Sequence, residues 1–386
     1  MSAKDPAFRF GRTPHPNTQD RNVLANFCWR LSARKERLAR IQVKALLTKA
    51  LVAIVAIGAQ VHGSGAQTVI PQQGVRVATQ PASFPASPRA QDPAPKGPLG
   101  GYNVLIADRG NNRLLLVNEA GKILWQYDFP GLPPENGADD AFFADGGKSI
   151  VTNLEHEQVI QVIDVATKTV TWQYGTLGKK GSAPGLLDFP DDAYKLPNGN
   201  IIVADIRNCR ILEIAPDKQI ARQAGQTGRC WGPDRLNSPN GDKPLANGHV
   251  LISTIGDHAI TELDKNWKQV ARLVLPIRYP SDPQLTQDGN FLVAGYTRPG
   301  KLMEIAKDGR VVWQYQPQPG GALNKPSLAI ELPNGNILVN DDLNARVVVI
   351  DKASNRIVWQ YGVTGQPGAA PGHLRIPDGL DIIKAD

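Results

Sequence analysis

The sequence is short of the residues that carry most enzyme and metal chemistry. Its 386 residues include three cysteines, six histidines and two methionines. Of the cysteines and histidines, only Cys209, Cys230 and four histidines fall after residue 100. No histidine lies close to either cysteine in the sequence, which argues against a cysteine–histidine metal site. Acid–base chemistry at neutral pH would also depend on very few histidines.

Long apolar runs are also missing, and the longest lies near the N-terminus. It spans residues 50–59, well short of the about 20 residues that a membrane-spanning helix needs. Lys44 and Lys49 precede it, and Ser64 and Ala66 fit the small-residue pattern of a cleavage site. Residues 43–66 therefore predict a cleaved signal peptide, with an uncleaved signal anchor as the alternative. We expect export to the periplasm or the extracellular space, with membrane attachment only through that anchor.

Two further segments surround the signal. Residues 1–42 are interpreted as an N-terminal extension that is either an over-extended reading frame or disordered. Residues 67–98 are rich in proline, alanine and glutamine, which predicts a disordered linker. Residues 1–49 carry 11 Lys and Arg against 3 Asp and Glu, which leaves 32 basic and 33 acidic residues elsewhere. The formal charge of +7 therefore belongs to the tail, and nucleic acid is not expected as a partner.

From residue 100 onward the sequence repeats a unit of short alternating strands and tight turns. Two weaker copies start at residues 143 and 245. The four clear copies begin with "NVLIADRGNNRLLLV" at 103, "LPNGNIIVADIRNCRILEI" at 196, "TQDGNFLVAGYTRPGKLMEI" at 286 and "LPNGNILVNDDLNARVVVI" at 332. Asn-Gly and Asp-Gly turns join the strands. A period of about 45 residues with four strands per unit is typical of a β-propeller.

The copy at residue 103 lacks an innermost strand, and the C-terminus supplies one. "PDGLDIIKAD" at 377–386 aligns with "PDDAYKLPNG" at 190–199, which contains an innermost strand. We therefore predict an all-β, six-bladed propeller of four-stranded blades over residues 99–386, closed by the C-terminal strand joining the first blade. Closure removes the exposed edges that an open sheet would present. We expect a monomer.

Several of these repeats resemble known propeller families. "IDVATKTVTWQYG" and "IDKASNRIVWQYG" resemble the tryptophan-docking repeats of PQQ-like propellers, and "ADRGNNRLLLV" resembles an NHL repeat. "LPNGN" before a strand is similar to bacterial arylsulfotransferase-like propellers. PQQ dehydrogenases have adjacent cysteines near the quinone, and arylsulfotransferases work through a channel histidine. This sequence has neither adjacent cysteines nor a histidine in an innermost strand, so neither a quinone nor a nucleotide is supported as a cofactor.

One face of the predicted propeller carries the long, varied loops. In this fold the turns between the second and third strands share a face with the loops between blades. Cys209 lies in such a turn and Cys230 in the loop that leaves the same blade. Export to an oxidising space favours a disulfide between them, with two free buried thiols as the alternative. Because sites are usually built from variable loops on a rigid scaffold, we expect a small molecule or a protein to bind this face.

The same face carries the candidate site. All six innermost strands are predicted to begin with a small oxygen-bearing side chain, and several have a second one directly afterwards. Together they predict a largely acidic ring at one mouth of the central channel. Its members are Asp139, Asp140, Asp191, Asp192, Asn240, Asp242, Ser281, Asp282, Ser327 and Asp378.

Three interpretations of the ring stay open. The side chains cap their own turns, or they bind a hard cation such as calcium, which takes oxygen ligands, or they line a polar pocket or water-filled channel. His156 and His258 lie in turns on the same face and are weak catalytic candidates. The leading functional hypothesis is extracytoplasmic binding or scaffolding. The alternatives are a calcium-assisted hydrolase or lyase and, less favoured, an arylsulfotransferase-like enzyme.

Overall fold

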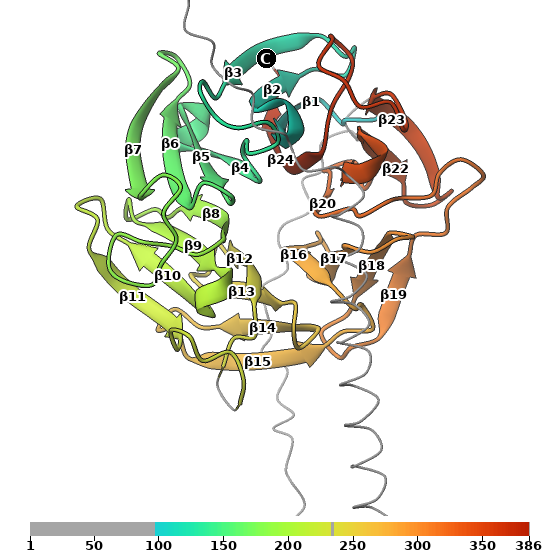
Figure 1. Ribbon diagram of the computed structural model, residues 1–386. Helices are drawn as coiled ribbons and strands as arrows, with labels where there is room; N and C mark the ends of the chain where they lie inside the picture. The colour runs from blue at the N-terminus through green and yellow to red at the C-terminus, as the bar shows by residue number, and fades with distance from the viewer. Residues whose placement is uncertain (1–96, 233–234, 386) are drawn as a thin grey trace, which may run out of the picture. The chain divides into compact units, whose positions relative to one another are not determined.

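The computed structural model describes residues 97–232 and 235–385. Within them, six four-stranded antiparallel sheets surround a central axis (Figure 1). The predicted six-bladed, all-β propeller is therefore confirmed. The predicted extension, signal segment and most of the linker lie outside the described residues. In the described part of the chain, no helix is long and apolar enough to cross a membrane.

The first three blades are given from the innermost strand outward. Blade 1 contains β24 (Pro377–Lys384), β1 (Tyr102–Asp108), β2 (Arg113–Val117) and β3 (Ile123–Asp128). Blade 2 contains β4 (Ala141–Ala144), β5 (Ser149–Leu154), β6 (Val159–Asp164) and β7 (Thr169–Gly175). Blade 3 contains β8 (Pro190–Lys195), β9 (Ile201–Asp205), β10 (Arg210–Ile214) and β11 (Ile220–Gly225).

The other three blades follow the same order. Blade 4 contains β12 (Pro239–Pro244), β13 (Val250–Thr254), β14 (Ala259–Leu263) and β15 (Gln269–Val274). Blade 5 contains β16 (Pro280–Leu285), β17 (Phe291–Gly295), β18 (Lys301–Ile305) and β19 (Val311–Gln314). Blade 6 contains β20 (Ala329–Glu331), β21 (Ile337–Asp341), β22 (Arg346–Asp351) and β23 (Arg356–Gly362). Four single 3₁₀ turns complete the described elements: η1 (Arg109–Asn111), η2 (Asp145–Gly147), η3 (Ile206–Asn208) and η4 (Asp342–Asn344).

The C-terminal strand closes the ring as predicted. β24 pairs with β1 antiparallel, with Leu380 opposite Ile106 and Ile382 opposite Val104. Figure 1 shows the last, red strand beside the blue-green strands of blade 1. Two innermost strands start later than expected, because regular pairing begins at Ala141 in β4 and at Ala329 in β20. Their predicted ring positions, Asp139–Asp140 and Ser327, therefore precede the strand.

The hydrophobic core lies between the blades. Side chains alternate across a strand, so one strand contributes to the contacts with both neighbouring blades. In β5, Ile150 packs in a cluster with Leu105 and Leu114 of blade 1. Its neighbour Val151 packs in a cluster with Val203 and other residues of blade 3. Apolar side chains on both faces of the central strands therefore hold each blade to the next.

Tryptophans of the outermost strands add a polar contact between neighbouring blades. Each indole nitrogen donates to a backbone carbonyl of the following blade: Trp125 to Val165, Trp172 to Pro216, Trp313 to Lys352 and Trp359 to Glu119. In blade 3 the equivalent residue is Arg222, which donates to Lys265 and stacks on Trp267. The repeated tryptophans are thus structural.

Cys209 and Cys230 form a disulfide, with Cα atoms 5.2 Å apart. The bond closes a segment with a sequence separation of 21 and ties the turn after η3 to the loop between β11 and β12. A loop of this length contributes about 3 kcal/mol through the entropy of the unfolded chain. We expect the Cys209→Ser/Cys230→Ser variant to lose about that much free energy of unfolding, measured by denaturant titration.

The same measurement under reducing conditions provides the control for the disulfide. A reductant should destabilise the wild-type protein and leave the double variant unchanged. Equal stability of the reduced and oxidised wild-type protein would contradict a contribution from this bond.

Candidate functional site

A cavity of about 150 Å³ lies at the mouth of the central channel. Eight of the ten predicted ring residues line it, the exceptions being Asp192 and Asp242. Its lining is formed by Arg109, Asp139, Asp140, Glu155, His156, Asp191, Asn240, Tyr279, Ser281, Asp282, Tyr296, Ser327 and Asp378. The structure therefore brings most of the predicted ring into one cavity and adds residues that the sequence analysis did not propose.

Irregular strand pairing explains how neighbouring acidic residues gather at the ring. Between β8 and β9, Asp191 pairs with Ala204 and Ala193 with Val203, so Asp192 is an extra residue in the ladder. Related register shifts occur at the start of β12, β16 and β24. A bulge breaks the strict alternation of side chains and redirects them. It therefore allows both members of an Asp–Asp pair to lie near the axis.

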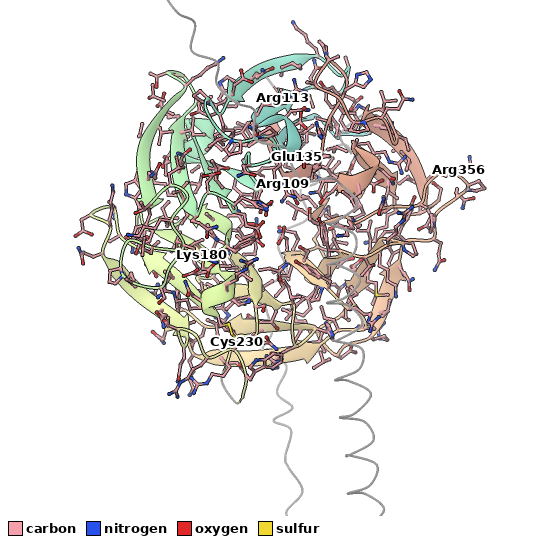
Figure 2. The ribbon with its side chains drawn as sticks, in the orientation of Figure 1. Arg109, Arg113, Glu135, Lys180, Cys230 and Arg356 are labelled. Carbon is pink, nitrogen blue, oxygen red and sulfur yellow. A yellow bond between two sulfur atoms is a disulfide. The ribbon has the colours of Figure 1, made fainter. Side chains whose placement is uncertain are left out.

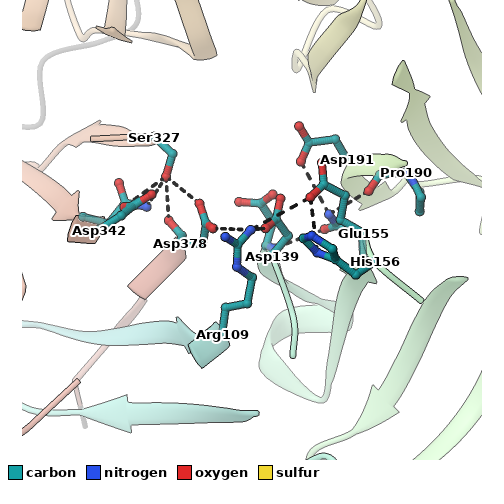
Figure 3. Close-up of polar contacts among 12 residues, drawn as sticks. Arg109, Asp139, Glu155, His156, Pro190, Asp191, Ser327, Asp342 and Asp378 are labelled. Atoms are coloured by element: carbon teal, nitrogen blue, oxygen red, sulfur yellow. Dashed lines mark hydrogen bonds and ion pairs between the residues drawn. The ribbon is translucent and has the colours of Figure 1, made fainter. Parts of the chain in front are cut away.

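Arg109 is the main residue that the sequence analysis missed. It belongs to η1, and its side chain reaches the inner edge of the ring of blades (Figure 2). Its Nη1 pairs with Asp139, lies 2.8 Å from Asp378 Oδ2 and 3.9 Å from Glu155 Oε2 (Figure 3). The ring is thus partly neutralised by a cation from the protein itself. The only sequence signal was a charged residue in a turn on the predicted site face.

The carboxylates also form two clusters in which Arg109 pairs with one member only, Asp139. Two triads, Asp139–Asp140–Asp191 and Asp140–Asp192–Asp282, each have oxygen atoms within 4.8 Å of one another. All five residues are buried. Both oxygens of Asp192 and one oxygen of Asp282 lack a hydrogen-bond partner among the described residues. This arrangement is costly unless protons or a bound cation neutralise the carboxylates.

The electrostatics of the cluster follow from burial and mutual repulsion. Burial raises the pKa of Asp140, Asp191, Asp192 and Asp282 well above the usual range, and neighbouring carboxylates raise it further. The pKa of Asp378 rises to about 7 through burial, although Arg109 acts in the opposite direction. Without a cation, these carboxyl groups therefore keep their protons to a higher pH than ordinary aspartates do.

Hydroxyl and amide groups connect the remaining ring positions. Asn240 donates to Ser281 Oγ at 3.2 Å and accepts from Ser253. Ser327 donates to Asp378 Oδ1 at 2.9 Å. Asp242 is fully buried, lies outside the cavity lining, and has two carboxylate oxygens without a partner in the described part of the chain. The ring is therefore polar throughout, and its carboxylates concentrate in blades 2 and 3, which contribute two each.

The two candidate histidines differ in position. His156 lines the cavity, with Nδ1 at 3.6 Å from Glu155 Oε2 and its ring 5.5 Å from that of Phe189. Burial, and after it the charge of Arg109, lowers the pKa of His156, so its imidazole is mostly neutral at pH 7. His258 is exposed and does not line the cavity. Of the two, only His156 is placed to act on a molecule bound there.

Buried ion pairs hold the surrounding loops against the blades. Asp108–Arg113, Asp205–Arg210 and Asp341–Arg346 each bond through an arginine Nε at 2.7 Å. Each aspartate also accepts a backbone N–H from a loop between blades, those of Arg375, Asp188 and Asn324 respectively. The repeated Asp, Asn and Arg of the "ADRGNNR" pattern therefore position the loops that surround the cavity.

Comparisons with known proteins agree with the fold. Residues 228–378 match a PQQ-type repeat model described as outer membrane protein assembly factor BamB. No curated protein sequence matches the chain. A protein of unknown function from Bacteroides caccae is 16% identical with a TM-score of 0.53, covering 74% of this chain and 99% of its own.

Two other solved structures are similar to the same extent. A streptogramin B lyase is 16% identical with a TM-score of 0.50, covering 75% of this chain and 95% of its own. A chain of a nidogen–laminin complex is 14% identical with a TM-score of 0.53, covering 74% of this chain and all of its own. At these identities the likeness establishes the fold alone, because one propeller scaffold hosts unrelated functions.

Proposed function

Because the domain is a PQQ-like β-propeller with buried carboxylates at its channel mouth, we propose that it is an extracytoplasmic binding protein with a divalent-cation site. The observation that carries this proposal is the Asp140–Asp192–Asp282 triad, in which Asp192 has no hydrogen-bond partner for either oxygen among the described residues. The long loops around the cavity would present a ligand or a protein partner to the same face.

Calcium fits this donor set best. All the converging groups are oxygen donors, which suit hard cations rather than zinc or copper. Calcium binds oxygen at about 2.4 Å, so two ligands on opposite sides of the ion can be as far apart as the 4.8 Å limit met by both triads. Magnesium usually keeps several waters and needs only one or two carboxylates. A crowded set of carboxylates therefore favours calcium.

The disulfide bond supports an extracytoplasmic location. The Cys209–Cys230 bond needs an oxidising compartment to persist in most organisms. The sequence signal at residues 43–66 predicts the same compartment.

One observation favours a second candidate function, a calcium-assisted hydrolase or lyase. His156 lines the same cavity as the carboxylates, and its neutral imidazole could accept a proton from a bound substrate. In this alternative the cation would polarise the substrate and His156 would act as the base.

The decisive experiment measures calcium binding by isothermal titration calorimetry and thermal melting after chelator treatment. We expect the wild-type protein to bind calcium and to gain about 2.7 kcal/mol at a calcium concentration 100 times the Kd. Asp192→Asn should abolish this gain, while exposed Asp217→Asn should keep it. Without calcium, Asp192→Asn should be at least as stable as the wild type, because a buried repulsion is removed.

The affinity for calcium is expected to decrease at acidic pH. Protons and calcium compete for carboxylates whose pKa is raised in the folded protein. The affinity for calcium should therefore fall as the pH is lowered, which titrations at neutral and at mildly acidic pH would measure. No calcium-linked change in melting would refute the cation site, and an unchanged affinity in Asp192→Asn would place the cation elsewhere.

A further inference from the structure

The cavity above the Asp140–Asp192–Asp282 triad has walls of two different chemistries. Tyr279 precedes β16 and Tyr296 follows β17, so both lie on blade 5 at the channel mouth. The Tyr296 N–H donates to the Tyr279 carbonyl at 3.0 Å, and the two ring centroids are 5.2 Å apart. Both tyrosines line the cavity. They provide a fixed aromatic wall.

Carboxylates line other parts of the same cavity. Glu155 follows β5 of blade 2, Asp191 belongs to β8 of blade 3, and Asp282 belongs to β16. Asp282 is 3% exposed, and its Oδ1 is buried with no partner in the part of the chain that the structure describes. Arg109 neutralises Asp139 and Asp378 but makes no ion pair with Asp191 or Asp282. Two buried carboxyl groups without a cationic partner among the described residues therefore lie in the same cavity as the aromatic wall.

One basic side chain of the protein lies among the carboxylates of the cavity, and another lies over the ring of one of its tyrosines. The guanidinium of Arg109 lies among Asp139, Asp378 and Glu155 inside the cavity. Lys325 Nζ lies 4.7 Å from the centroid of the Tyr296 ring. Nitrogen cations are thus stabilised here by both carboxylates and a tyrosine face, and such contacts are the usual means of recognising organic cations.

From this combination we infer that the cavity binds a small organic cation, a primary ammonium or guanidinium compound. Its N–H groups donate to Asp191 and Asp282, and its hydrocarbon part packs against Tyr279 and Tyr296. A cavity of about 150 Å³ holds a molecule with about six non-hydrogen atoms, such as benzene. The inference deepens the proposed function, since it names a ligand class for the same channel mouth.

The organic cation and the metal share part of one site. Asp282 and Asp140 belong to the metal triad and also line the cavity, so the two ligands should compete. Two residues distinguish the metal site from the organic-cation site. Asp192 belongs to the triad but does not line the cavity, whereas Tyr279 lines the cavity but belongs to neither triad. Variants at these positions can therefore distinguish the two ligands.

The test titrates full-length protein with butylammonium chloride by calorimetry, with sodium chloride at equal concentration and neutral butanol as controls. We expect saturable binding of butylammonium, no binding of butanol, and weaker binding of tetramethylammonium, which has no N–H to donate. Tyr279→Leu should weaken butylammonium binding about tenfold, and Tyr279→Phe should retain it, because the flat ring and not the hydroxyl contacts the ligand.

The variants also separate failure of this inference from failure of the metal proposal. Tyr279→Leu should leave calcium affinity and melting unchanged, which also shows that it is folded. Asp192→Asn should lose calcium and keep butylammonium. If the wild type binds calcium but no butylammonium, or binds butanol equally well, the organic-cation inference is wrong and the metal site stands. If butylammonium binds and calcium does not, the metal proposal fails alone.

Discussion

Removal of residues 377–386 is expected to abolish cooperative folding of the propeller. The deletion removes β24, exposes the inner edge of β1 and takes Leu380 out of the core, where it is fully buried. It also removes Asp378, which pairs with Arg109 and accepts from Ser327. Losing an eight-residue strand whose first four residues are buried should cost as much as the roughly 5–15 kcal/mol that typically holds a domain folded.

Thermal melting and hydrogen exchange of the truncated protein measure this effect. We expect no cooperative transition, and we expect a synthetic peptide of residues 377–386, added in excess, to restore part of it by pairing with β1. Lys384→Ser, at the exposed end of the same strand, should melt like the wild type. A truncated protein that melts within a few degrees of the full chain would contradict closure by β24.

Asp341→Ala is expected to destabilise the protein by about 3–5 kcal/mol, the usual effect of breaking a buried ion pair. Asp341 is fully buried and accepts from Arg346 Nε at 2.7 Å, Asn344 Nδ2 at 2.8 Å and the Asn324 N–H at 2.6 Å. Its removal leaves the Arg346 guanidinium buried without its carboxylate. It also releases the loop that carries Ser327 to the ring.

Denaturant unfolding of two further variants tests whether the buried ion pair causes this loss of stability. Asp341→Asn keeps an oxygen that can accept from Asn324 and should therefore lose less stability than Asp341→Ala. Asp308→Ala removes an exposed carboxylate 3.8 Å from Arg310 and should have little effect, because exposed pairs contribute little. Equal stability of Asp341→Ala and Asp308→Ala would show that the buried pair does not hold the loop.

Much of the architecture could be predicted because it depends on local patterns that repeat. Alternating apolar residues and Asn-Gly or Asp-Gly turns define strands wherever they occur, and six copies define six blades. The alignment of residues 377–386 with residues 190–199 was enough to predict closure, and β24 confirms it. The Cys209–Cys230 disulfide was predicted in the same way, since the repeat placed both cysteines on one face.

The candidate site was predicted only in outline. The repeat indicated which residues begin the innermost strands, and eight of the ten do line one cavity. The repeat could not indicate that Arg109 enters this cavity from η1, because the path of a long side chain depends on its neighbours in space. Nor could it separate His156 from His258, which both lie exposed in similar turns although only His156 lines the cavity.

The sequence by itself therefore determined the fold and the closure of the ring, because hydrophobic alternation and turn residues act over a few neighbouring positions. It also indicated eight of the side chains that line the cavity. Only the tertiary structure decided which charges meet. Bulges such as the one at Asp192 redirect side chains, and blades far apart in the chain bring Arg109, Tyr279 and the carboxylates to one cavity. Electrostatic interactions depend on distance in space and burial, and neither can be read from spacing along the chain.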